Sequence, residues 1–421
     1  MKKVVILGGG LSGLAAGEIL SKNFKVIILE KENYLGGLAS LFEYKGKHIP
    51  KYYHHIIKSN KITQKYLKEF GKIDLRNLKW KKIKVFIGLD KKLSAINNLW
   101  GLLKFRGLNL YEKFRFGLFG LYTLFLMNPK KISENLSAEK WLNKYAGKGV
   151  TKKIFYHLYS KNKFNIPLKD ISAKQFAYRL YEKEIYDFFA YPKEGYQKMI
   201  IGLKKEIEKG KGIIKIKSKI SEINLEKKYV IESGKKIKYD ILMSTIPFEE
   251  FIKISKGLPK EFKEKVSKIK YCPAVSVCFG TEDFLLKNAY WINFFNERIH
   301  ILMQHSVLCD NYSEKINWCL RYGGSEEDLK LNDEEIKKEY LKVIKKYFPN
   351  VKIKWARVFK TKYGEPIYNK DYYKYVPEHK SKIKGVYFAG IQLTYPKIRN
   401  MNVALESGIK VARKILKDFK E

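Results

Sequence analysis

The feature that most constrains this chain is a glycine turn that joins an apolar run to a helical pattern close to the first residue. Val4–Leu7 is a short apolar run rich in β-branched residues, typical of a parallel strand buried on both faces. Gly8–Gly13 follows with the spacing G-x-G-x-x-G. A helical pattern then covers Leu14–Lys22, and a second apolar run covers Val26–Leu29. This order of elements predicts a Rossmann-type βαβ unit.

The residue types in this turn are those that a dinucleotide site requires. Gly8 permits a tight turn, Gly10 lets the backbone approach a pyrophosphate, and Gly13 lets helix and strand pack closely. The N–H groups that open the helix, near Leu11 and Ser12, would face the negative charge of the pyrophosphate. The turn therefore predicts a bound dinucleotide.

A carboxylate and a second glycine turn follow the second predicted strand. Glu30 lies about 20 residues beyond the first turn, where a carboxylate accepts a hydrogen bond from a ribose hydroxyl. Lys31 comes next, and Gly36 and Gly37 form the second turn, with Leu38 after it. This pattern resembles the FAD-binding superfamily of amine oxidases, protoporphyrinogen oxidase, phytoene desaturase and UDP-galactopyranose mutase. The resemblance implies that these residues contact FAD, although Leu38 stands where the superfamily often has a basic residue.

The far end of the sequence carries a second resemblance to the same superfamily. Gly385–Gly390 has the pattern of a buried strand, and Met401–Lys417 has that of a helix. In the superfamily this strand presents the start of the last helix to the flavin, where a helix N-terminus stabilises negative charge on the reduced ring. Ile391 follows the strand, where many redox members have aspartate. The resemblance implies contacts to FAD from Gly390, Met401, Asn402 and Ala404.

Two matches in the middle of the chain support the same cofactor. Ile220 lies in a stretch that resembles the segment whose backbone contacts adenine. Thr245 lies in a stretch that resembles the return of the chain to the FAD domain. Motifs at opposite ends of a chain that serve one cofactor seldom arise by chance, so we expect a flavoprotein that binds FAD.

Lys51–Asn60 is the stretch most relevant to chemistry. It resembles UDP-galactopyranose mutases, in which a histidine lies beside the isoalloxazine, and His55 falls on that histidine. We expect His54 or His55 to hydrogen-bond the flavin edge or to move a proton; the alternative is a structural pair in an aromatic cluster. Arg399 and Tyr395 are further catalytic candidates, with Arg399 placed for a substrate phosphate or the flavin.

Two functions stay open at this point. The first is an oxidoreductase like protoporphyrinogen oxidase, amine oxidase or desaturase, which passes hydride from an unidentified, lipid-like substrate to flavin N5. The second is an isomerase like UDP-galactopyranose mutase, in which N5 of reduced FAD attacks a nucleotide-sugar without net redox change. The overall family spacing favours the first function. The Lys51–Asn60 match and the positive charge favour the second, for which Arg179 is a further phosphate candidate.

The length of 421 residues exceeds one ordinary core, so several structural units are expected. We predict an α/β fold with a Rossmann-type FAD-binding domain assembled from 1–60, 189–255 and 380–421. An inserted helical cap at 61–188 and a mixed β-sheet substrate domain at 256–379 complete it. Helical patterns in the cap include Tyr111–Met127, Lys152–Tyr159 and Ala173–Tyr181, and one strand is expected there at Ile83–Leu89. Strands expected in the substrate domain are Ala274–Gly280, Tyr290–Leu302, Asn317–Tyr322 and Lys352–Lys360.

The formal charge is +42, from 85 Lys and Arg against 43 Asp and Glu, and it suits an anionic partner. The excess is mainly lysine spread along the chain, which favours a general field over a designed patch. The sequence shows no compact basic run of the nucleic-acid type, no zinc-finger spacing and no CxxC pair. We therefore expect no nucleic acid, no metal and a reducing cytoplasmic location. The sequence predicts no oligomeric state.

One helical stretch, Trp100–Met127, allows two interpretations. It combines leucine and aromatic residues with Lys104, Arg106, Lys113 and Arg115. Apolar residues at helical spacing are usually core, so the pattern favours a helical pair packed within the cap. The alternative is a peripheral membrane contact that gives access to a lipid substrate. Its longest apolar run, Phe116–Met127, is too short to span a bilayer.

Overall fold

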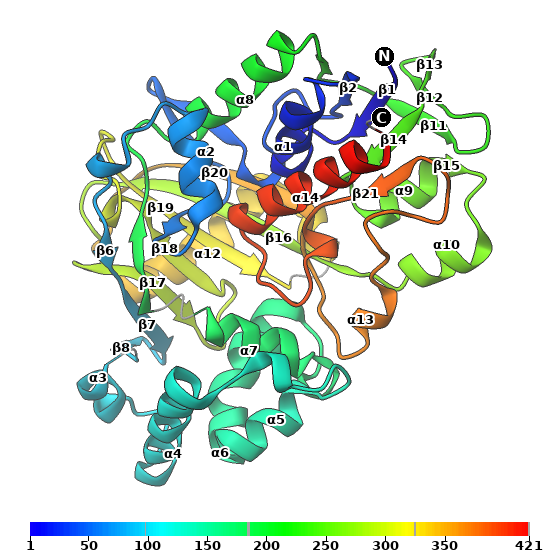
Figure 1. The fold of residues 1–421 in the computed structure, drawn as a ribbon. Coiled ribbons are helices and arrows are strands. Elements are labelled where there is room, and N and C mark those ends of the chain that lie inside the picture. The colour runs from blue at the N-terminus through cyan, green and yellow to red at the C-terminus, as the bar shows by residue number, and fades with distance from the viewer. Residues whose placement is uncertain (97, 183–185, 324–325, 420–421) are drawn as a thin grey trace.

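A computed structural model describes residues 1–96, 98–182, 186–323 and 326–419. A parallel sheet, a larger mixed sheet and a helical layer make up the molecule (Figure 1). The two termini lie close together beside the parallel sheet, at the opposite end from the helical layer (Figure 1). The predicted fold class is confirmed: a Rossmann-type sheet is combined with a mixed substrate-domain sheet.

The parallel sheet has the strand order β10 (Ile213–Lys215), β2 (Lys25–Leu29), β1 (Lys3–Leu7), β14 (Ile241–Ser244) and β21 (Val386–Phe388). Every neighbouring pair in it is parallel. β1 is central, and its side chains from Val4 to Leu7 are fully buried, as expected for an apolar strand covered on both faces. The predicted βαβ unit is therefore present, with β1 and β2 paired from Lys3 and Lys25 onward.

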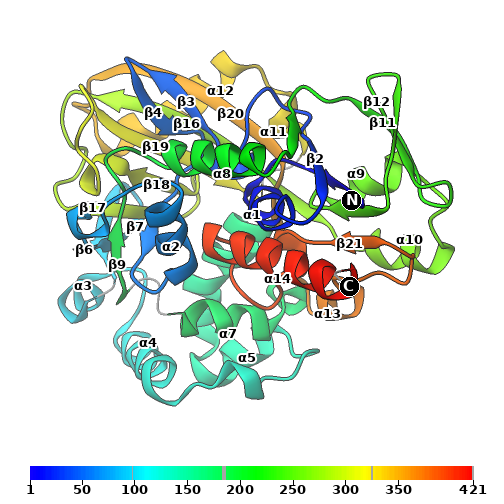
Figure 2. The same cartoon turned by 45° about the horizontal axis from the view of Figure 1, so that its top comes forward.

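The first and last helices of the chain pack against each other. α1 (Leu11–Leu20), α8 (Gln197–Lys209) and α14 (Met401–Phe419) lie side by side (Figure 2). A Cβ atom on Gly408 would lie 2.1 Å from the backbone oxygen of Ser12, so glycine allows α14 to approach α1 this closely. Ser12 Oγ donates a hydrogen bond of 2.7 Å to the carbonyl of Ala404. This contact brings the two ends of the chain to one place.

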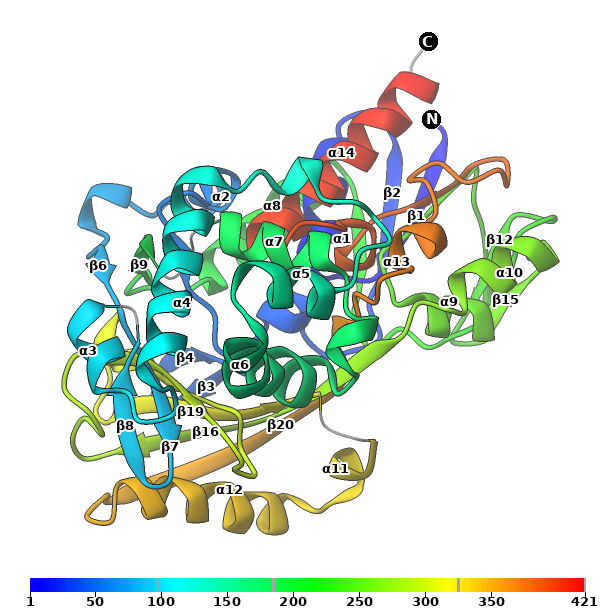
Figure 3. The ribbon, with the colours of Figure 1, turned by 90° about the horizontal axis from the view of Figure 1, so that it is seen from below.

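The mixed sheet has the strand order β20 (Ile353–Pro366), β16 (Tyr271–Thr281), β19 (Lys315–Tyr322), β18 (Ile301–Gln304), β17 (Ala289–Phe294), β7 (Lys84–Leu89) and β8 (Lys92–Ala95). α12 (Asp333–Tyr347) lies along one face of this sheet, where it buries Ile336, Tyr340 and Ile344 (Figure 3). The predicted single strand Tyr290–Leu302 is wrong. The chain reverses there, with Asn296 in the left-handed region, and forms β17 and β18 instead.

The helical layer contains α3 (Leu99–Lys104), α4 (Leu110–Leu121), α5 (Ala138–Tyr145), α6 (Lys148–Val150) and α7 (Ala173–Tyr181). The helix predicted at Lys152–Tyr159 is present as part of η5 (Thr151–Phe164), which is wound as a π-helix and stops at Asn165 in a left-handed conformation. The wider winding is rare and is often found at functional sites. η5 ends beside Lys163, a residue of the candidate site.

Smaller sheets and short helices complete the fold. β3 (Leu41–Tyr44) pairs with β4 (Lys47–Pro50), and β9 (Phe188–Ala190) lies between β5 (Ile56–Ile57) and β6 (Lys81–Lys82). Another sheet has the order β13 (Lys235–Lys238), β12 (Tyr229–Glu232), β11 (Ile220–Asn224) and β15 (Ser255–Lys256). Further helices are α2 (Lys61–Glu69), α9 (Phe248–Ile254), α10 (Lys260–Val266), α11 (Glu326–Lys330) and α13 (Tyr372–Tyr375). Short helical turns are η1 (Gly37–Ala39), η2 (Leu75–Asn77), η3 (Tyr122–Leu126), η4 (Pro129–Lys131), η6 (Leu168–Asp170), η8 (His305–Val307) and η9 (Ile391–Leu393).

The division into three domains stays a prediction, and one predicted segment contributes to two units. β7 and β8 fall within 61–188, which we expected to form the helical cap. However, β7 pairs in parallel with β17 and continues the mixed sheet. Two strands of the predicted cap segment, β7 and β8, are therefore part of the substrate sheet.

The α1–α14 contact predicts a specific stability effect. Gly408→Ala places a methyl group against the backbone of Ser12, and we expect it to destabilise the protein by roughly 1–3 kcal/mol. Gly117→Ala is the matched control, because its added Cβ meets nothing within 4 Å and helical alanine is favoured over glycine by up to about 1 kcal/mol. Chemical denaturation of both variants tests this. Equal stability of the two variants would contradict the proposed contact.

Candidate functional site

The first glycine turn leaves the N-terminus of α1 open. Gly8 has a φ of +100°, and Gly10 precedes the helix without a side-chain cap. The first bond within the helix runs from the Leu14 N–H to the Gly10 oxygen, at 2.9 Å. The N–H groups of the residues before Leu14 point out of the helix end, where an anion is favoured. A Cβ on Gly13 would lie 2.1 Å from the Gly8 oxygen, so this turn requires glycine there.

The two predicted glycine turns contact each other beside this helix end. The Gly36 N–H donates to the Gly9 oxygen over 2.9 Å, and Gly10 forms a parallel β-bridge with Gly36. A Cβ on Gly37 would lie 3.2 Å from the Cα of Gly10. The structure thus brings together two segments that the sequence assigned separately to one cofactor.

Glu30 is held in place directly after β2. Its carboxylate accepts hydrogen bonds from the Gly9 N–H, at 2.7 Å, and from the Glu32 N–H, at 2.9 Å. The residue is buried, with 7% of its surface exposed. Each carboxylate oxygen has a second lone pair for a ribose hydroxyl. An open helix end, two glycine turns and a fixed carboxylate fit the adenosine diphosphate part of FAD.

The other predicted cofactor residues surround these turns. Thr245 Oγ1 donates to the Leu7 oxygen over 2.8 Å, and Gly390, with a φ of +113°, donates its N–H to Ser407 Oγ over 3.0 Å. The Asn402 side-chain oxygen accepts the N–H groups of Ile62 and Thr63, which caps the start of α2. Leu11 and Met401 are buried, Lys31 is exposed, and Leu38, Ile220 and Ala404 are half-buried. Their contacts with FAD stay predictions.

The two predicted histidines lie in an aromatic cluster. His54 Nδ1 lies 2.8 Å from the carbonyl of Tyr52, which can only accept, so Nδ1 carries the proton and Nε2 is the acceptor. Burial lowers the pKa of His54 to about 4, so the ring is neutral at pH 7. His55 Nδ1 lies 2.9 Å from the Tyr290 hydroxyl, and its ring lies 4.6 Å from that of Phe189. Both the functional and the structural interpretation of this pair fit these contacts.

A buried carboxylate with three cations lies near the histidines. Glu365, on β20, is fully buried. Lys163 Nζ lies 2.7 Å from its Oε2, and Arg179 donates from Nη2 to its Oε1 over 3.1 Å. Arg399 Nε lies 3.7 Å from Oε2. The three cationic side chains are 13–16% exposed, so four charged groups share a largely desolvated site.

The charges in this cluster shift each other's titration. Burial alone would raise the pKa of Glu365, but the charges of Lys163, Arg399 and Arg179 lower it to about 2. Burial and the neighbouring guanidinium of Arg179 lower the pKa of Lys163 to about 8. At pH 7 Lys163 is therefore mainly cationic and Glu365 is ionised.

Tyr322 links the cation cluster to the histidines. Arg399 Nη2 donates to the Tyr322 hydroxyl over 3.1 Å, and Lys163 Nζ lies 5.5 Å from the centre of the Tyr322 ring. Tyr53, which precedes His54, packs edge-on against Tyr322 with ring centres 6.2 Å apart. The structure thus places predicted candidate Arg399 close to the histidine segment.

Tyr395, the fourth predicted catalytic residue, faces the helical layer. Its hydroxyl lies 2.8 Å from Ser172 Oγ and donates to Glu134 Oε2 over 3.0 Å. Burial and the charge of Glu134 raise its pKa. Its ring packs on Tyr368 and Tyr372. These contacts describe a packed tyrosine, and its catalytic role stays a prediction.

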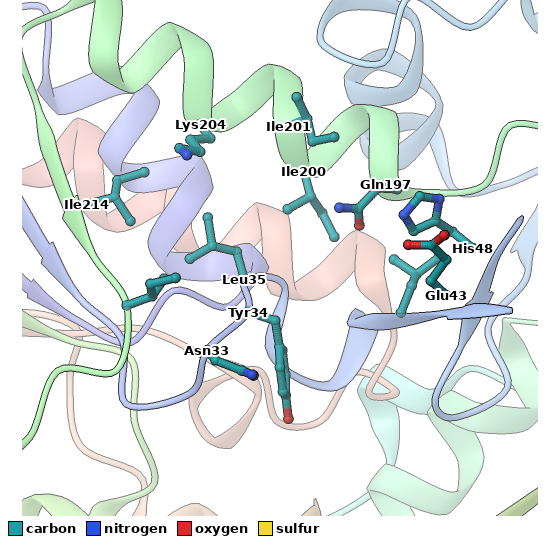
Figure 4. A pocket seen from close by; sticks show the side chains of 12 residues that line it. Asn33, Tyr34, Leu35, Glu43, His48, Gln197, Ile200, Ile201, Lys204 and Ile214 are labelled. Atoms are coloured by element: carbon teal, nitrogen blue, oxygen red, sulfur yellow. The ribbon is translucent and has the colours of Figure 1, made fainter. Parts of the chain in front are cut away.

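A surface groove of about 390 Å³ lies beside the second glycine turn (Figure 4). Asn33, Tyr34 and Leu35 form one side of it, and Gln197, Ile200 and Lys204 of α8 form the other (Figure 4). None of the predicted site residues is among those that line it. The groove therefore adds nothing to the assignment of the catalytic region.

A comparison with protein families decides the identity of this fold. Residues 11–416 match the family model of flavin-containing amine oxidoreductases. The chain belongs to this family. It is therefore an FAD-dependent oxidoreductase of the amine oxidase family, and the predicted FAD cofactor is confirmed. The glycine turns and Glu30 fit that cofactor, as shown above.

Individual relatives of this oxidoreductase are distant. The 15-cis-phytoene desaturase of an Oncidium hybrid cultivar is 22% identical, over 99% of this chain and 78% of its own length. A structure of reduced UDP-galactopyranose mutase is 14% identical, with a TM-score of 0.79 over 100% of this chain and 95% of that one. An oxidoreductase from Methanosarcina mazei is 16% identical, with a TM-score of 0.75 over 98% and 100% of the two chains. The predicted superfamily is confirmed, and the structural matches establish the fold.

Within the described ranges of this oxidoreductase, no helix is long and apolar enough to cross a bilayer. No group of three or more His, Cys, Asp and Glu side chains in the same ranges is arranged to hold a metal ion. The four cysteines are buried and unpaired. The small-molecule substrate expected of an oxidoreductase follows from the family.

Sequence reasoning missed three residues of the cation cluster region: Lys163, Tyr322 and Glu365. Lys163 is one of 85 Lys and Arg residues, and nothing in its spacing distinguishes it. Glu365 gave no signal either, because the strand predicted at Lys352–Lys360 ends before it, whereas the observed β20 continues to Pro366 and buries this carboxylate. Identifying its cationic partners requires the tertiary structure.

The position of Glu30 directly after β2 predicts that its replacement weakens the binding of FAD. Glu30→Ala removes the acceptor for the ribose and leaves the Gly9 N–H without its partner. We expect FAD to bind roughly ten- to a hundredfold more weakly, which corresponds to the loss of one charged hydrogen bond. Titration of the apoprotein with FAD measures this. Glu32→Ala, which changes a nearby exposed side chain, is the control, and an equal loss there would contradict the assignment of Glu30.

Proposed function

We propose that this oxidoreductase removes hydride from a carbon of a lipid-like substrate that also carries an anionic group, with flavin N5 as the hydride acceptor. The observation that supports the anionic group is the cation cluster around Glu365. The proposal extends the family assignment, which concerns the cofactor and the class of reaction.

The charge balance of the cluster supports an anionic substrate. Lys163, Arg179 and Arg399 bring three cationic groups to the single buried carboxylate of Glu365. Largely buried charges are costly unless they are paired. A phosphate group carries a complementary charge and matches the donors of guanidinium groups. We therefore assign a phosphate-like group of the substrate to this cluster.

The surroundings of the cluster suit an apolar substrate body. Tyr53 packs against both Tyr322 and Trp291, with ring centres 6.2 and 6.3 Å apart. Phe189 and Tyr290 contact His55 in the same region. Aromatic side chains offer large apolar surfaces with few polar demands. An amphiphilic substrate would therefore place its anionic end at the cations and its carbon chain along these rings.

Two side chains supply the remaining polar chemistry. His54 is neutral at pH 7 and has Nε2 as an acceptor, so it suits a hydrogen bond from substrate or cofactor. Bound FAD would supply the hydride acceptor. Arg399 orients the substrate by charge and by its contact with Tyr322. His55 and Tyr395 stay candidates for contacts with the reacting centre.

A second function has specific support. The fold matches reduced UDP-galactopyranose mutase with a TM-score of 0.79, and His55 occupies the position that resembles the flavin-side histidine of that enzyme class. The three cations that gather at Glu365 also suit the diphosphate of a nucleotide-sugar. The alternative proposal is therefore isomerisation of a nucleotide-sugar without net redox change.

One anaerobic experiment separates the two proposals. Oxidised enzyme is mixed with a polyprenyl phosphate, and the absorbance of oxidised flavin is followed. Reduced enzyme is mixed with UDP-galactofuranose, and the sugar products are separated by chromatography. Bleaching in the first mixture supports the oxidoreductase proposal. Formation of UDP-galactopyranose with the flavin still reduced would replace it with the isomerase proposal.

The shifted titration of Lys163 predicts a pH dependence of anion binding. Lys163 is cationic below its pKa of about 8 and loses its charge as the pH rises through that value. Sulfate, whose charge is constant in this range, should therefore bind the flavin-loaded enzyme more weakly above about pH 8. In Lys163→Arg this loss should disappear, because arginine stays charged. Calorimetric titration with sulfate at several pH values measures the effect.

The matched truncation tests the same cluster at fixed pH. Lys163→Met should weaken sulfate binding about tenfold at pH 7, since one charged contact is lost. Lys346→Met is the control, because Lys346 is paired with Glu297 at 2.6 Å outside the cluster. Unchanged sulfate affinity in Lys163→Met would remove the support for an anionic substrate group.

A further inference from the structure

Large apolar side chains are exposed on one region of the helical layer. Trp100 is 74% exposed, Leu110 80% and Phe125 78%. The region comprises α3, α4 and η3, and we call it the α3–α4 face. Its exposed members are Leu99, Trp100, Leu103, Leu110, Tyr111, Phe114, Leu118, Leu121, Phe125 and Leu126. Monomeric proteins rarely leave such a concentration of apolar surface in water, and contiguous patches of this kind mark interaction sites.

The apolar side chains of α4 form one stripe that points outward. Leu110, Phe114 and Leu118 recur every four residues, and Leu121 and Phe125 continue the same face. Glu112 and Phe119, on the opposite side of the helix, are buried. The stretch therefore packs into the helical layer through buried residues such as Leu102, Phe105 and Phe119, and its other side faces away from the protein.

The segment that carries this stripe is rich in basic residues and poor in acidic ones. Between residues 91 and 131 the basic residues are Lys91, Lys92, Lys104, Arg106, Lys113, Arg115, Lys130 and Lys131. The acidic residue in that range is Glu112, which is buried and paired with Lys153 at 2.8 Å. The face thus combines exposed leucine and aromatic side chains with positive charge. This composition is that of helices that lie in the interface of a bilayer with anionic lipids.

The position of the face makes it accessible and connects it to the candidate site. α3 and α4 lie at the edge of the molecule farthest from the two termini (Figure 1), and α4 is toward the viewer in Figure 3. α3 follows β8, which pairs with β7, and β7 pairs with β17. β17 carries Tyr290 and Trp291, which contact His55 and Tyr53. The face is therefore connected to the candidate site through neighbouring strands of the mixed sheet.

We propose that the α3–α4 face docks this protein peripherally on an anionic lipid bilayer. The exposed apolar side chains enter the boundary between headgroups and acyl chains, and the flanking lysines and arginines contact lipid phosphates. A second copy of the chain fits this face less well. A two-fold contact between identical faces would set the same cations against each other.

Vesicle flotation tests the docking independently of any catalytic activity. The flavin-loaded protein is mixed with phosphatidylcholine vesicles that contain either no phosphatidylglycerol or a substantial fraction of it. We expect the protein to float with the anionic vesicles and to dissociate progressively as salt is raised, because salt screens the charge attraction. Failure to float with anionic vesicles at low salt would overturn the proposal.

Paired substitutions assign the binding to the face. Phe114→Glu together with Phe125→Glu should weaken vesicle binding at least about tenfold, since two inserted apolar groups become charged. Ile201→Glu together with Ile216→Glu is the matched control, because these side chains are 41% and 47% exposed away from the face. Because all four positions are exposed, circular dichroism should show folded protein for both variants. Equal binding by the two double variants would overturn the assignment.

Light scattering of the purified protein tests whether a second copy of the chain covers the face instead of a bilayer. We expect a mass that is the same for the wild type and the Phe114→Glu, Phe125→Glu variant. A wild-type dimer that this variant converts to a monomer would mean that a second copy covers the face, and it would overturn the membrane proposal.

Discussion

The close crossing of α1 and α14 is the contact on which the rest of the site depends. Gly408 allows α14 to contact the backbone of Ser12 in α1. Gly13 allows the start of α1 to pack against the backbone of Gly8 in the preceding turn. Thr245 lies next to both Gly8 and Gly390, so the segment around Gly390 is close to the first glycine turn. A cofactor that needs residues from both ends of the chain can bind only if this crossing forms. Packing at close backbone approach therefore determines where the chemistry is located.

The buried carboxylate Glu365 connects the other units to that frame. Lys163 comes from η5, Arg179 from α7, and Arg399 from the segment before α14, while Glu365 itself comes from β20 of the mixed sheet. Removal of one partner from a buried ion pair generally costs about 3–5 kcal/mol. The cluster thus favours one relative placement of its elements. Its three cations connect that structural role to the proposed binding of an anionic substrate.

In the helical layer, residues of the same type are buried or exposed according to their position in the fold. Trp141 and Phe176 of this layer are buried in its core, whereas Trp100 and Phe125 are exposed. All four are aromatic residues in helical segments, so neither residue type nor local structure separates them. What separates them is the presence of a neighbouring element, which is a tertiary property. An amphipathic stripe without such a neighbour needs a partner, and the cations around it indicate an anionic one.

By itself the sequence determined the cofactor and the core of the fold. The apolar run at Val4–Leu7, the glycines at 8, 10 and 13 and the carboxylate of Glu30 are local features, and their geometry follows from short-range sterics and hydrogen bonding. The turn at Asn296 had a signal in the sequence, because the polar residues Asn296, Glu297 and Arg298 interrupt the apolar pattern of Tyr290–Leu302. The tertiary structure alone decided that Lys163 and Glu365, which are 202 residues apart in the sequence, form an ion pair. It also decided that the stripe on α4 faces outward. Both outcomes depend on long-range packing, which no local pattern of residues encodes.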